Sequence, residues 1–160
     1  MRVEFVSPFV EAAREVVESE IGGGTDRGEI HLVKSAHTTD EVTAVVGVTG
    51  RVAGVVLYSM SEQTARAIVS RMLGQDFPEF DSLAQSGIGE LGNVITGRAG
   101  VLLAEAGYSS NITPPALVVG TGTLVTTLDL NRLVFPLGTD LGPLEIQVVL
   151  REQPRPILKS

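Results

Sequence analysis

The chain has 160 residues and a formal net charge of -7, from 19 acidic and 12 basic side chains. The length fits one domain, and the acidic balance excludes the basic surface of a nucleic-acid-binding protein. No cysteine occurs, which excludes a thiol nucleophile, a redox centre and a cysteine metal cluster. No apolar run can span a membrane, and no signal-peptide core is present. We expect a cytoplasmic protein with a single domain over 1–152 and a frayed tail over 153–160.

The first part of the chain predicts a helix followed by strands. Ser7-Pro8 has the form of an N-cap followed by a proline in the first turn. Apolar residues then recur at helical spacing until the glycines at 22–24. Three segments rich in Val, Ile and Thr predict strands, and they are residues 29–36, 41–48 and 51–59. Thr49-Gly50 is expected to form the hairpin turn between the last two.

Two helices and a second set of strands follow. Ser61 is placed to cap a helix that runs to residue 73 and ends at Gly74. After a loop over 75–80, a long helical pattern covers about 81–106. Four further strands are expected near residues 116–120, 123–128, 132–137 and 144–151.

The order of these elements predicts an α+β fold. Adjacent strands joined by short turns form a mainly antiparallel sheet, against which the helices pack. A helix followed by a hairpin occurs in both halves of the chain, as 8–21 with 41–59 and as 81–106 with 123–151. This order hints at an internal repeat, although few residues are identical between the halves.

The long helix has an apolar and a polar side when it is wound at 100° per residue. The apolar side is expected to face the core and comprises Ala84, Ile88, Leu91, Ile95, Ala99, Leu102 and Ala106. The opposite side comprises Ser86, Glu90, Asn93 and Gly97, with Gly89 and Gly100 beside it. Because Glu90 and Asn93 are three residues apart, their side chains are neighbours and point outward.

This helix contains five glycines, at positions 87, 89, 92, 97 and 100. Each costs about 1 kcal/mol relative to alanine in a helix interior, so the five together approach the net stability of a domain. Close packing of neighbouring elements explains some of them. Those beside Glu90 and Asn93, such as Gly89 and Gly97, lower the surface so that the two polar side chains project toward a partner.

The Glu90 and Asn93 pair suits one kind of chemistry. The Asn93 amide does not titrate near neutral pH, but it can hold a water molecule at fixed geometry. The Glu90 carboxylate is anionic at pH 7 and suits a Lys or Arg partner. Together they could assist hydrolysis of a phosphoryl group, if a partner brings the phosphate, its Mg²⁺ and its cation. The alternative is an ordinary solvated helix surface.

Other patterns give weaker signals. Residues 87–92 satisfy G-x-G-x-x-G, but a helix precedes them where a dinucleotide site needs a strand. His31 and His37 lack the spacing of metal ligands, so we expect no metal site. Four acidic residues of the first helix are expected to form its solvated face, and they are Glu11, Glu15, Glu18 and Glu20.

Ile88–Gly97, with the sequence IGELGNVITG, resembles the helix motif of the CheX/CheC/FliY family of chemotaxis phosphatases. Further stretches are similar to the same family, and they are Gly47–Gly50, Gly54–Val56, Met60–Glu62, Glu105–Tyr108, Ile112–Pro115 and Val118–Gly120. The resemblance covers nearly the whole chain and is weakest over 22–40 and the last eight residues.

The resemblance implies a pseudo-twofold CheC-like fold and an enzyme activity. The family accelerates hydrolysis of the aspartyl phosphate on a CheY-like response regulator of two-component signalling. By position, Asn93 would orient the attacking water, Glu90 would pair with the regulator's lysine, and Ser86 would contact the regulator. Mg²⁺ would be supplied by the regulator, so no cofactor is expected in this chain. The alternative is a non-catalytic regulator-binding adaptor in a chemotaxis or flagellar-switch complex.

The single motif and the length resemble CheX-like members of the family. Such proteins are typically homodimers joined through their sheets, and the uncharged strand expected near 123–128 would suit this pairing. The first helix has no Asn, so no second site is expected there. The paired prolines at 114–115 match a downstream family proline with a structural role. Gly92 stands where relatives often have alanine, which predicts a looser turn between Glu90 and Asn93.

Overall fold

The computed structural model describes residues 3–33, 37–38, 40–120, 124–125 and 131–154. The helices are a short 3-10 helix η1 (Val3–Phe5), α1 (Ser7–Ile21), α2 (Glu62–Leu73) and α3 (Ser82–Glu105). The strands are β1 (Thr25–Arg27), β2 (His31–Val33), β3 (His37–Thr38), β4 (Val42–Gly50), β5 (Val52–Met60), β6 (Ser110–Ile112), β7 (Ala116–Val119), β8 (Leu124–Val125), β9 (Arg132–Thr139) and β10 (Leu144–Glu152). Within these ranges, no helix is long and apolar enough to cross a membrane.

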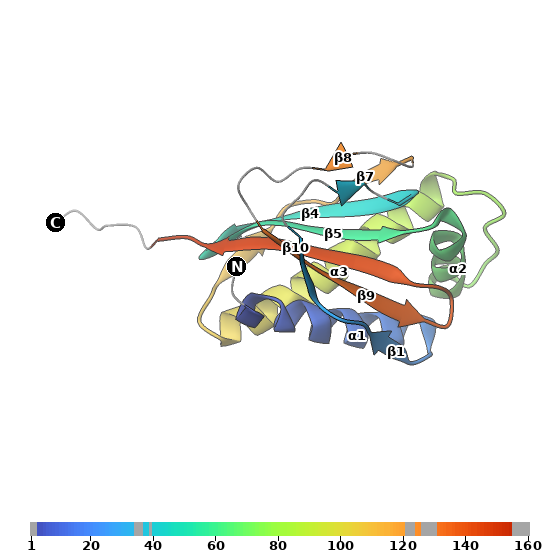
Figure 1. Cartoon of the computed structure of the whole chain (residues 1–160). Coiled ribbons are helices and arrows are strands. Elements are labelled where there is room, and N and C mark those ends of the chain that lie inside the picture. The colour runs from blue at the N-terminus through green and yellow to red at the C-terminus, as the bar shows by residue number, and fades with distance from the viewer. Residues whose placement is uncertain (1–2, 34–36, 39, 121–123, 126–130, 155–160) are drawn as a thin grey trace.

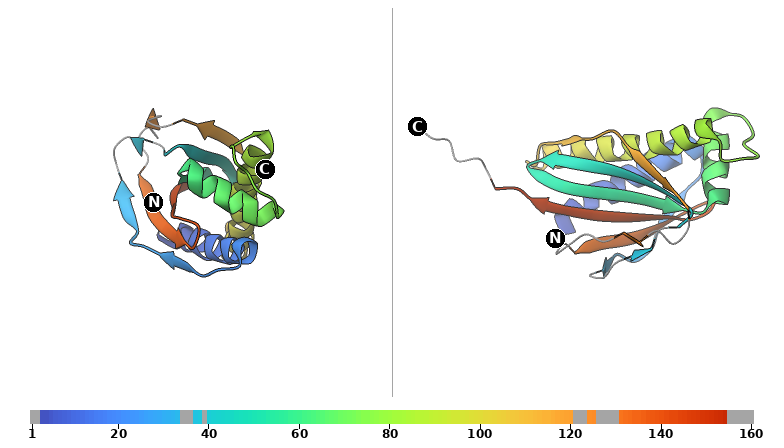
Figure 2. Two further views of the ribbon diagram at one scale, coloured as in Figure 1. Left: turned by 90° about the vertical axis from the view of Figure 1, so that its right-hand side faces the viewer. Right: turned by 90° about the horizontal axis from the view of Figure 1, so that it is seen from above.

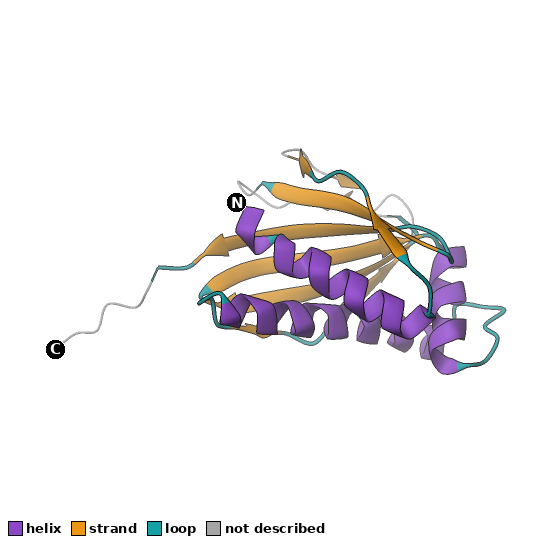
Figure 3. Ribbon diagram, turned by 90° about the horizontal axis from the view of Figure 1, so that it is seen from below, coloured by secondary structure: helices purple, strands orange, loops and turns teal. Residues whose placement is uncertain are grey.

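A curved antiparallel sheet and a layer of helices make up the fold (Figures 1 and 2). The main sheet has the strand order β1-β9-β10-β5-β4-β6, with β2 also paired to β9 and β7 to β4. Figure 3 shows α1 and α3 side by side across one face of this sheet, with α2 at one end. The predicted α+β class and the mainly antiparallel sheet are therefore confirmed.

The connectivity of the strands is symmetric about the central pair β5 and β10. The strand after α1, β1, joins the hairpin β9–β10, and the strand after α3, β6, joins the hairpin β4–β5. In the same way β2 pairs with β9 and β7 pairs with β4, while β3 pairs with β8. Each half of the chain thus supplies a helix, short strands and a hairpin, as the repeat in the sequence indicated. Helix α2 has no counterpart among the described elements.

The core lies between the sheet and the two long helices. Alternate residues of the hairpin strands face the helices and form the core. In β4 and β5 these residues are Val42, Ala44, Val46, Val48, Val52, Val56, Tyr58 and Met60. In β9 and β10 they are Leu133, Phe135, Leu137, Leu144, Ile146, Val148 and Leu150. Several residues on the other face of these strands are buried as well, among them Leu57, Val134 and Val149.

The helix ends follow the predicted capping residues with one exception. Gly22 and Gly74 adopt the left-handed conformation, with φ of 76° and 69°, and end α1 and α2. The Ser61 hydroxyl accepts a hydrogen bond from the Thr64 N–H, which caps α2. The prediction of Ser7 as an N-cap was wrong, because η1 leads directly into α1 and Val6 is the residue that precedes the helix.

Several strand predictions need correction. The strand β4 extends through Gly50, and the chain turns at Arg51, so the turn lies later than Thr49-Gly50. The strand predicted over 29–36 was wrong at residues 29–30, which precede β2, and residues 34–36 lie outside the described ranges. Of the strand expected near 123–128, only β8 is described, and it pairs with β3 in a separate two-stranded sheet.

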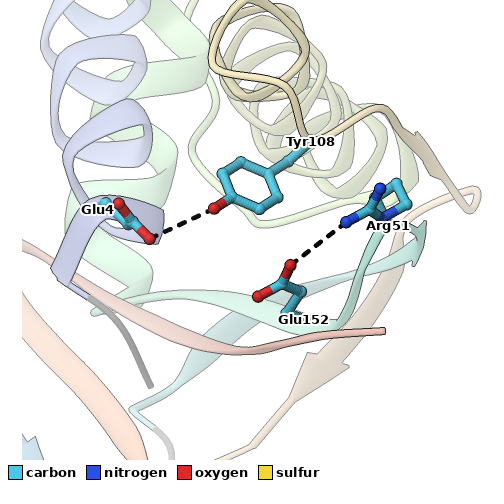
Figure 4. Close-up of polar contacts among 4 residues, drawn as sticks. All are labelled: Glu4, Arg51, Tyr108 and Glu152. Carbon is cyan, nitrogen blue, oxygen red and sulfur yellow. Dashed lines mark hydrogen bonds and ion pairs between the residues drawn. The ribbon is translucent and has the colours of Figure 1, made fainter. Parts of the chain in front are cut away.

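Contacts between segments distant in sequence stabilise the end of the molecule at which α3 ends (Figure 4). The Tyr108 hydroxyl donates a hydrogen bond of 3.5 Å to the Glu4 carboxylate. The Tyr108 ring also packs edge to face on Phe5, with ring centroids 5.0 Å apart. Close by, Arg51 and Glu152 form an ion pair of 3.3 Å. The turn after α3 is thereby fixed to the N-terminal segment.

Candidate functional site on helix α3

Helix α3 begins at a well-formed cap and packs along the sheet. The Asp81 carboxylate accepts a hydrogen bond of 2.9 Å from the Ala84 N–H. The predicted apolar side is buried over most of its length, at Ala84, Ile88, Leu91, Ile95 and Ala99. At the C-terminal end the prediction was wrong: Leu103 is buried, Leu102 is only half-buried, and Ala106 lies beyond the helix and is exposed.

The predicted site residues divide into an exposed group and a buried one. Glu90 and Ser86 are exposed, one turn apart, and Asn93 and Gly97 are half-buried beside them. Within the described residues, neither the Glu90 nor the Asn93 side chain makes a hydrogen bond or an ion pair. Gly89 differs from the expectation, because it is buried next to Pro115 and does not belong to the exposed face.

The glycines of α3 have different structural reasons. A Cβ at Gly87 would lie 3.0 Å from Val69 on α2, and a Cβ at Gly92 would lie 3.2 Å from the Tyr58 ring and 3.3 Å from Ala44. A Cβ at either position would lie closer to its neighbours than an ordinary van der Waals contact, so close packing favours glycine there. At Gly97 and Gly100 a Cβ would have ordinary contacts, of 3.8 Å and 3.6 Å. Packing therefore leaves Gly97, beside Asn93, without a structural requirement for glycine.

A buried hydrogen-bond chain holds α3 to β5 directly beneath the site. The Thr96 hydroxyl donates to the Gly92 carbonyl at 2.7 Å, and 2.7 Å separates the Tyr58 and Thr96 hydroxyl oxygens. Because the only Thr96 hydroxyl proton goes to Gly92, the Tyr58 hydroxyl donates to Thr96. Burial raises the pKa of Tyr58 far above its usual range, so the phenol stays protonated and can donate.

Gly92 is thus an anchoring position between Glu90 and Asn93, and α3 is helical through it. Its backbone carbonyl accepts from Thr96, and its Cα lies against β4 and β5. The structure gives a packing reason for this glycine in place of the looser turn that we expected. Sequence reasoning missed Tyr58 and Thr96, although a Thr on the inward side of a helix signals bonding to the carbonyl four residues earlier.

The segment before β7 forms one side of the site. Gly47 of β4 exchanges two hydrogen bonds of 2.9 Å with Thr113, one to its backbone and one to its hydroxyl. This clamp fixes Pro114 and Pro115, and a Cβ at Gly89 would meet the Pro115 ring at 3.6 Å. The structural role expected for the proline pair therefore has a physical basis: Pro115 packs beside Gly89, about one helical turn before Asn93.

Charge is sparse on α3. Between residues 82 and 104 the charged side chains are Glu90 and Arg98, and Arg98 forms a 3.2 Å ion pair with Glu15 of α1. Glu90 is therefore an isolated acid on an uncharged helix face. No group of three potential metal ligands occurs among the described residues. The G-x-G-x-x-G pattern at 87–92 lies wholly within α3, and no strand leads into it.

The geometry supplies two functional groups on a rigid element. The amide at position 93 can bind water, and the carboxylate at position 90 can bind a cation. The Asn93 amide is neither a nucleophile nor an acid or base near neutral pH. Such a pair can assist a reaction only together with a partner that brings its own electrophile and cation.

Known proteins resemble this chain in sequence and in structure. Residues 42–138 match the family model described as chemotaxis phosphatase CheX. The CheY-P phosphatase CheX of Thermotoga maritima is 32% identical over 121 residues, which are 75% of this chain and 78% of the relative. The residues that match the family model include β4, α3 and the proline segment.

Solved structures share the fold over almost the whole length. The chemotaxis protein CheX of Desulfovibrio desulfuricans superposes with a TM-score of 0.83 at 26% identity, over 94% of this chain and 99% of that chain. CheX of Borrelia burgdorferi, solved in a complex with CheY, BeF3 and Mg²⁺, gives a TM-score of 0.77 at 25% identity, over 94% and 100% of the two chains. The chain belongs to the chemotaxis phosphatase CheX family.

Proposed function

We propose that this chain is a phosphatase that accelerates hydrolysis of the aspartyl phosphate on a CheY-like response regulator. The observation that carries the proposal is the pair Glu90 and Asn93, presented without partners in the described structure on an otherwise uncharged face of α3. Membership of the CheX family supports it, as does the relative named as a CheY-P phosphatase.

Asn93 orients the water that attacks phosphorus. In hydrolysis, a bond forms between the water oxygen and phosphorus, the aspartyl oxygen–phosphorus bond breaks, and the aspartate carboxylate leaves. Phosphoryl transfer depends mainly on positioning and on stabilisation of charge. The side-chain carbonyl oxygen of Asn93 accepts a hydrogen bond from the water. The amide takes up no proton, so the protons of the attacking water leave with the phosphate product.

Glu90 binds the regulator's active-site lysine. A charge-assisted hydrogen bond between carboxylate and ammonium is stronger than a neutral one, and it fixes the orientation of the regulator relative to Asn93. Mg²⁺ bound by the regulator would neutralise charge on the phosphoryl group, and this chain would contribute no ligand to the ion. Ser86 lies one turn before Glu90 and contacts the regulator, while glycine at position 97 leaves space beside Asn93.

The test is a rate measurement on a regulator phosphorylated with a small phosphodonor. Phosphate loss is followed with the wild-type chain, Asn93→Ala and Glu90→Ala, and binding is measured in parallel. We expect acceleration by the wild type that disappears in both variants, with unchanged thermal unfolding. Retained binding without acceleration by the wild type would instead identify an adaptor. Unchanged acceleration by Asn93→Ala would contradict the assignment of the site.

The same proposal includes the assembly and the compartment. The protein acts in the cytoplasm, where the regulator is, and as a homodimer joined through sheet edges. The strand expected to join the subunits, near 123–128, lies largely outside the described residues, apart from β8. Sedimentation of the full chain tests the dimer, and a monomer at micromolar concentration would contradict it.

A further inference from the structure

The buried hydrogen-bond chain beneath α3 ends on the backbone next to Asn93. The Tyr58 hydroxyl lies 2.7 Å from the Thr96 hydroxyl, which donates to the Gly92 carbonyl oxygen at 2.7 Å. This carbonyl belongs to the peptide group whose nitrogen is that of Asn93. Because a peptide group is planar, a hydrogen bond that holds the Gly92 oxygen also orients the bond from this nitrogen to the Asn93 Cα. The chain therefore connects β5 to the residue that carries the amide.

Helix α1 allows a comparison within the same molecule, because it occupies the matching place in the other half of the fold. In sequence, Ser7 of α1 corresponds to Ser86 of α3. With this alignment, Glu11 falls at the position of Glu90. The buried residues of α1 between positions 8 and 17 all fall on buried residues of α3. The two helices therefore pack on the sheet in the same register.

Helix α1 lacks both the amide and the hydroxyl chain beneath it. Arg14 stands at the position of Asn93, and its guanidinium donates to Thr25. Val17 stands at the position of Thr96 and has no hydroxyl to donate. The residues of β9 and β10 that face the helices are all apolar. Packing of a long helix on this sheet therefore needs no hydroxyl at the matching place.

Stability alone does not explain the two hydroxyls beneath α3. A buried hydroxyl costs free energy unless it is hydrogen-bonded, and a bonded pair can be replaced by apolar groups of the same shape at almost no cost. A hydrogen bond differs from an apolar contact because it is directional. The tethered residue, Gly92, is of the type with the greatest backbone freedom, so its peptide group gains most from a directional contact.

We propose that Tyr58 and Thr96 are positioning residues for the hydrolysis, and that they set the direction of the Asn93 side chain through the peptide group between Gly92 and Asn93. This inference rests on the proposed function. Both hydroxyls are buried beneath the helix, so they touch neither the attacking water nor the regulator. Glu90 lies before the tethered peptide group. The chain therefore acts on the rate of the chemical step more than on regulator binding.

The test compares kcat and KM for dephosphorylation of the regulator among variants of the chain. Thr96→Val keeps the shape of the side chain and removes the hydroxyl, Thr96→Ser keeps the hydroxyl, and Tyr58→Phe removes one oxygen. The control is Val17→Ala, which opens the core at the matching place of α1. Thermal unfolding gives the folded fraction by which each rate is divided. Affinity is measured separately on a regulator loaded with BeF3 and Mg²⁺, which does not turn over.

We expect Thr96→Val to lower kcat about 10-fold and Tyr58→Phe about 3-fold, because a small misplacement of a group that orients a reactant slows the reaction strongly. KM and the affinity for the loaded regulator should stay within about 2-fold of the wild type, since the lost interaction acts only in the chemical step. Thr96→Ser and Val17→Ala should keep the kcat of the wild type.

Wild-type kcat in Thr96→Val and Tyr58→Phe would overturn the positioning role and leave the proposed function standing. An equal loss of kcat in Val17→Ala would overturn it as well, because any loss of stability would then slow the reaction. If Thr96→Val does not fold, Tyr58→Phe decides alone. No acceleration by the wild type would overturn the proposed function, and the positioning role with it.

Discussion

Helices α1 and α3 lie side by side on one face of the sheet, yet their exposed sides differ in charge. The exposed side of α1 is charged, with Glu11, Arg14, Glu15 and Glu20. The exposed side of α3 is nearly uncharged, with Leu83, Ser86, Glu90, Val94 and Val101. Because the two helices occupy matching places in the strand connectivity, the fold does not dictate this difference.

The charges of α1 are partly used within the chain. Arg14 donates to the hydroxyl and the carbonyl of Thr25, each at 3.3 Å, and Glu18 accepts from the Thr25 N–H at 3.1 Å. These contacts fix β1 against the helix. On α3, by contrast, Glu90 and Asn93 bind nothing in the described chain. The polar side of α1 therefore contributes contacts within the fold, whereas the Glu90 and Asn93 side chains of α3 contribute none in the described chain.

The largest expected effect comes from a charge placed at the site. Asn93→Asp preserves the side-chain shape but loses the amide donor and brings a second anion beside the phosphoryl group. We expect acceleration to fall by about 10²-fold or more, while the free energy of unfolding changes by about 0.5 kcal/mol or less. Initial rates and thermal unfolding are the measurements, and full activity in this variant would remove Asn93 from the mechanism.

The buried hydrogen bonds of Tyr58 and Thr96 give a second test of the comparison, because they hold α3 and not α1 to the sheet. Thr96→Val leaves the buried Tyr58 hydroxyl without its partner, which costs about 1–3 kcal/mol, whereas Tyr58→Phe removes a hydrogen bond worth about 1 kcal/mol. The double variant should be less destabilised than the sum of the two. Denaturant unfolding measures all three. Strict additivity would show that the two side chains are not coupled.

Two glycines of α3 should respond in opposite directions to the same substitution. Gly92→Ala places a methyl group against Tyr58 and Ala44, and we expect the overpacking to outweigh the gain in helix propensity by about 1 kcal/mol. Gly97→Ala has space and should be stabilising by up to about 1 kcal/mol. Each corresponds to a Tm shift of about 2–4 °C. Stabilisation by both would refute the packing role of Gly92.

The smallest effect is expected on α1. Glu15→Gln removes the exposed ion pair with Arg98, and such pairs contribute about 0.5 kcal/mol or less. Stability and acceleration should both stay near wild-type values. A large loss of regulator binding in this variant would extend the interaction surface onto α1 and weaken the contrast between the two helices.

Local chemistry made much of the fold predictable from sequence. The ends of α1 and α2 follow from Gly22, Ser61 and Gly74. The hairpin strands β4 and β5 follow from segments rich in β-branched residues. Strands β1 and β6 were missed because each has three residues, too few for a period-two pattern, and each pairs with a strand of the other half.

The outward position of Glu90 and Asn93 followed from helical periodicity alone. The reason for Gly92 did not, since it lies in contacts with Tyr58 and Ala44, which are distant in sequence. The hydrogen bond between Tyr58 and Thr96 spans 38 residues for the same reason. Local patterns identify the groups on a surface, whereas only the folded chain shows what supports them.

The central claim is that α3, and not α1, is the face that meets the regulator. The most direct measurement is an NMR titration of the isotope-labelled chain with a regulator loaded with BeF3 and Mg²⁺. The account predicts backbone shift changes concentrated over residues 83–101 and near Pro115, with small changes over 11–20. Shift changes concentrated on α1 or on the sheet, with 83–101 unaffected, would contradict it.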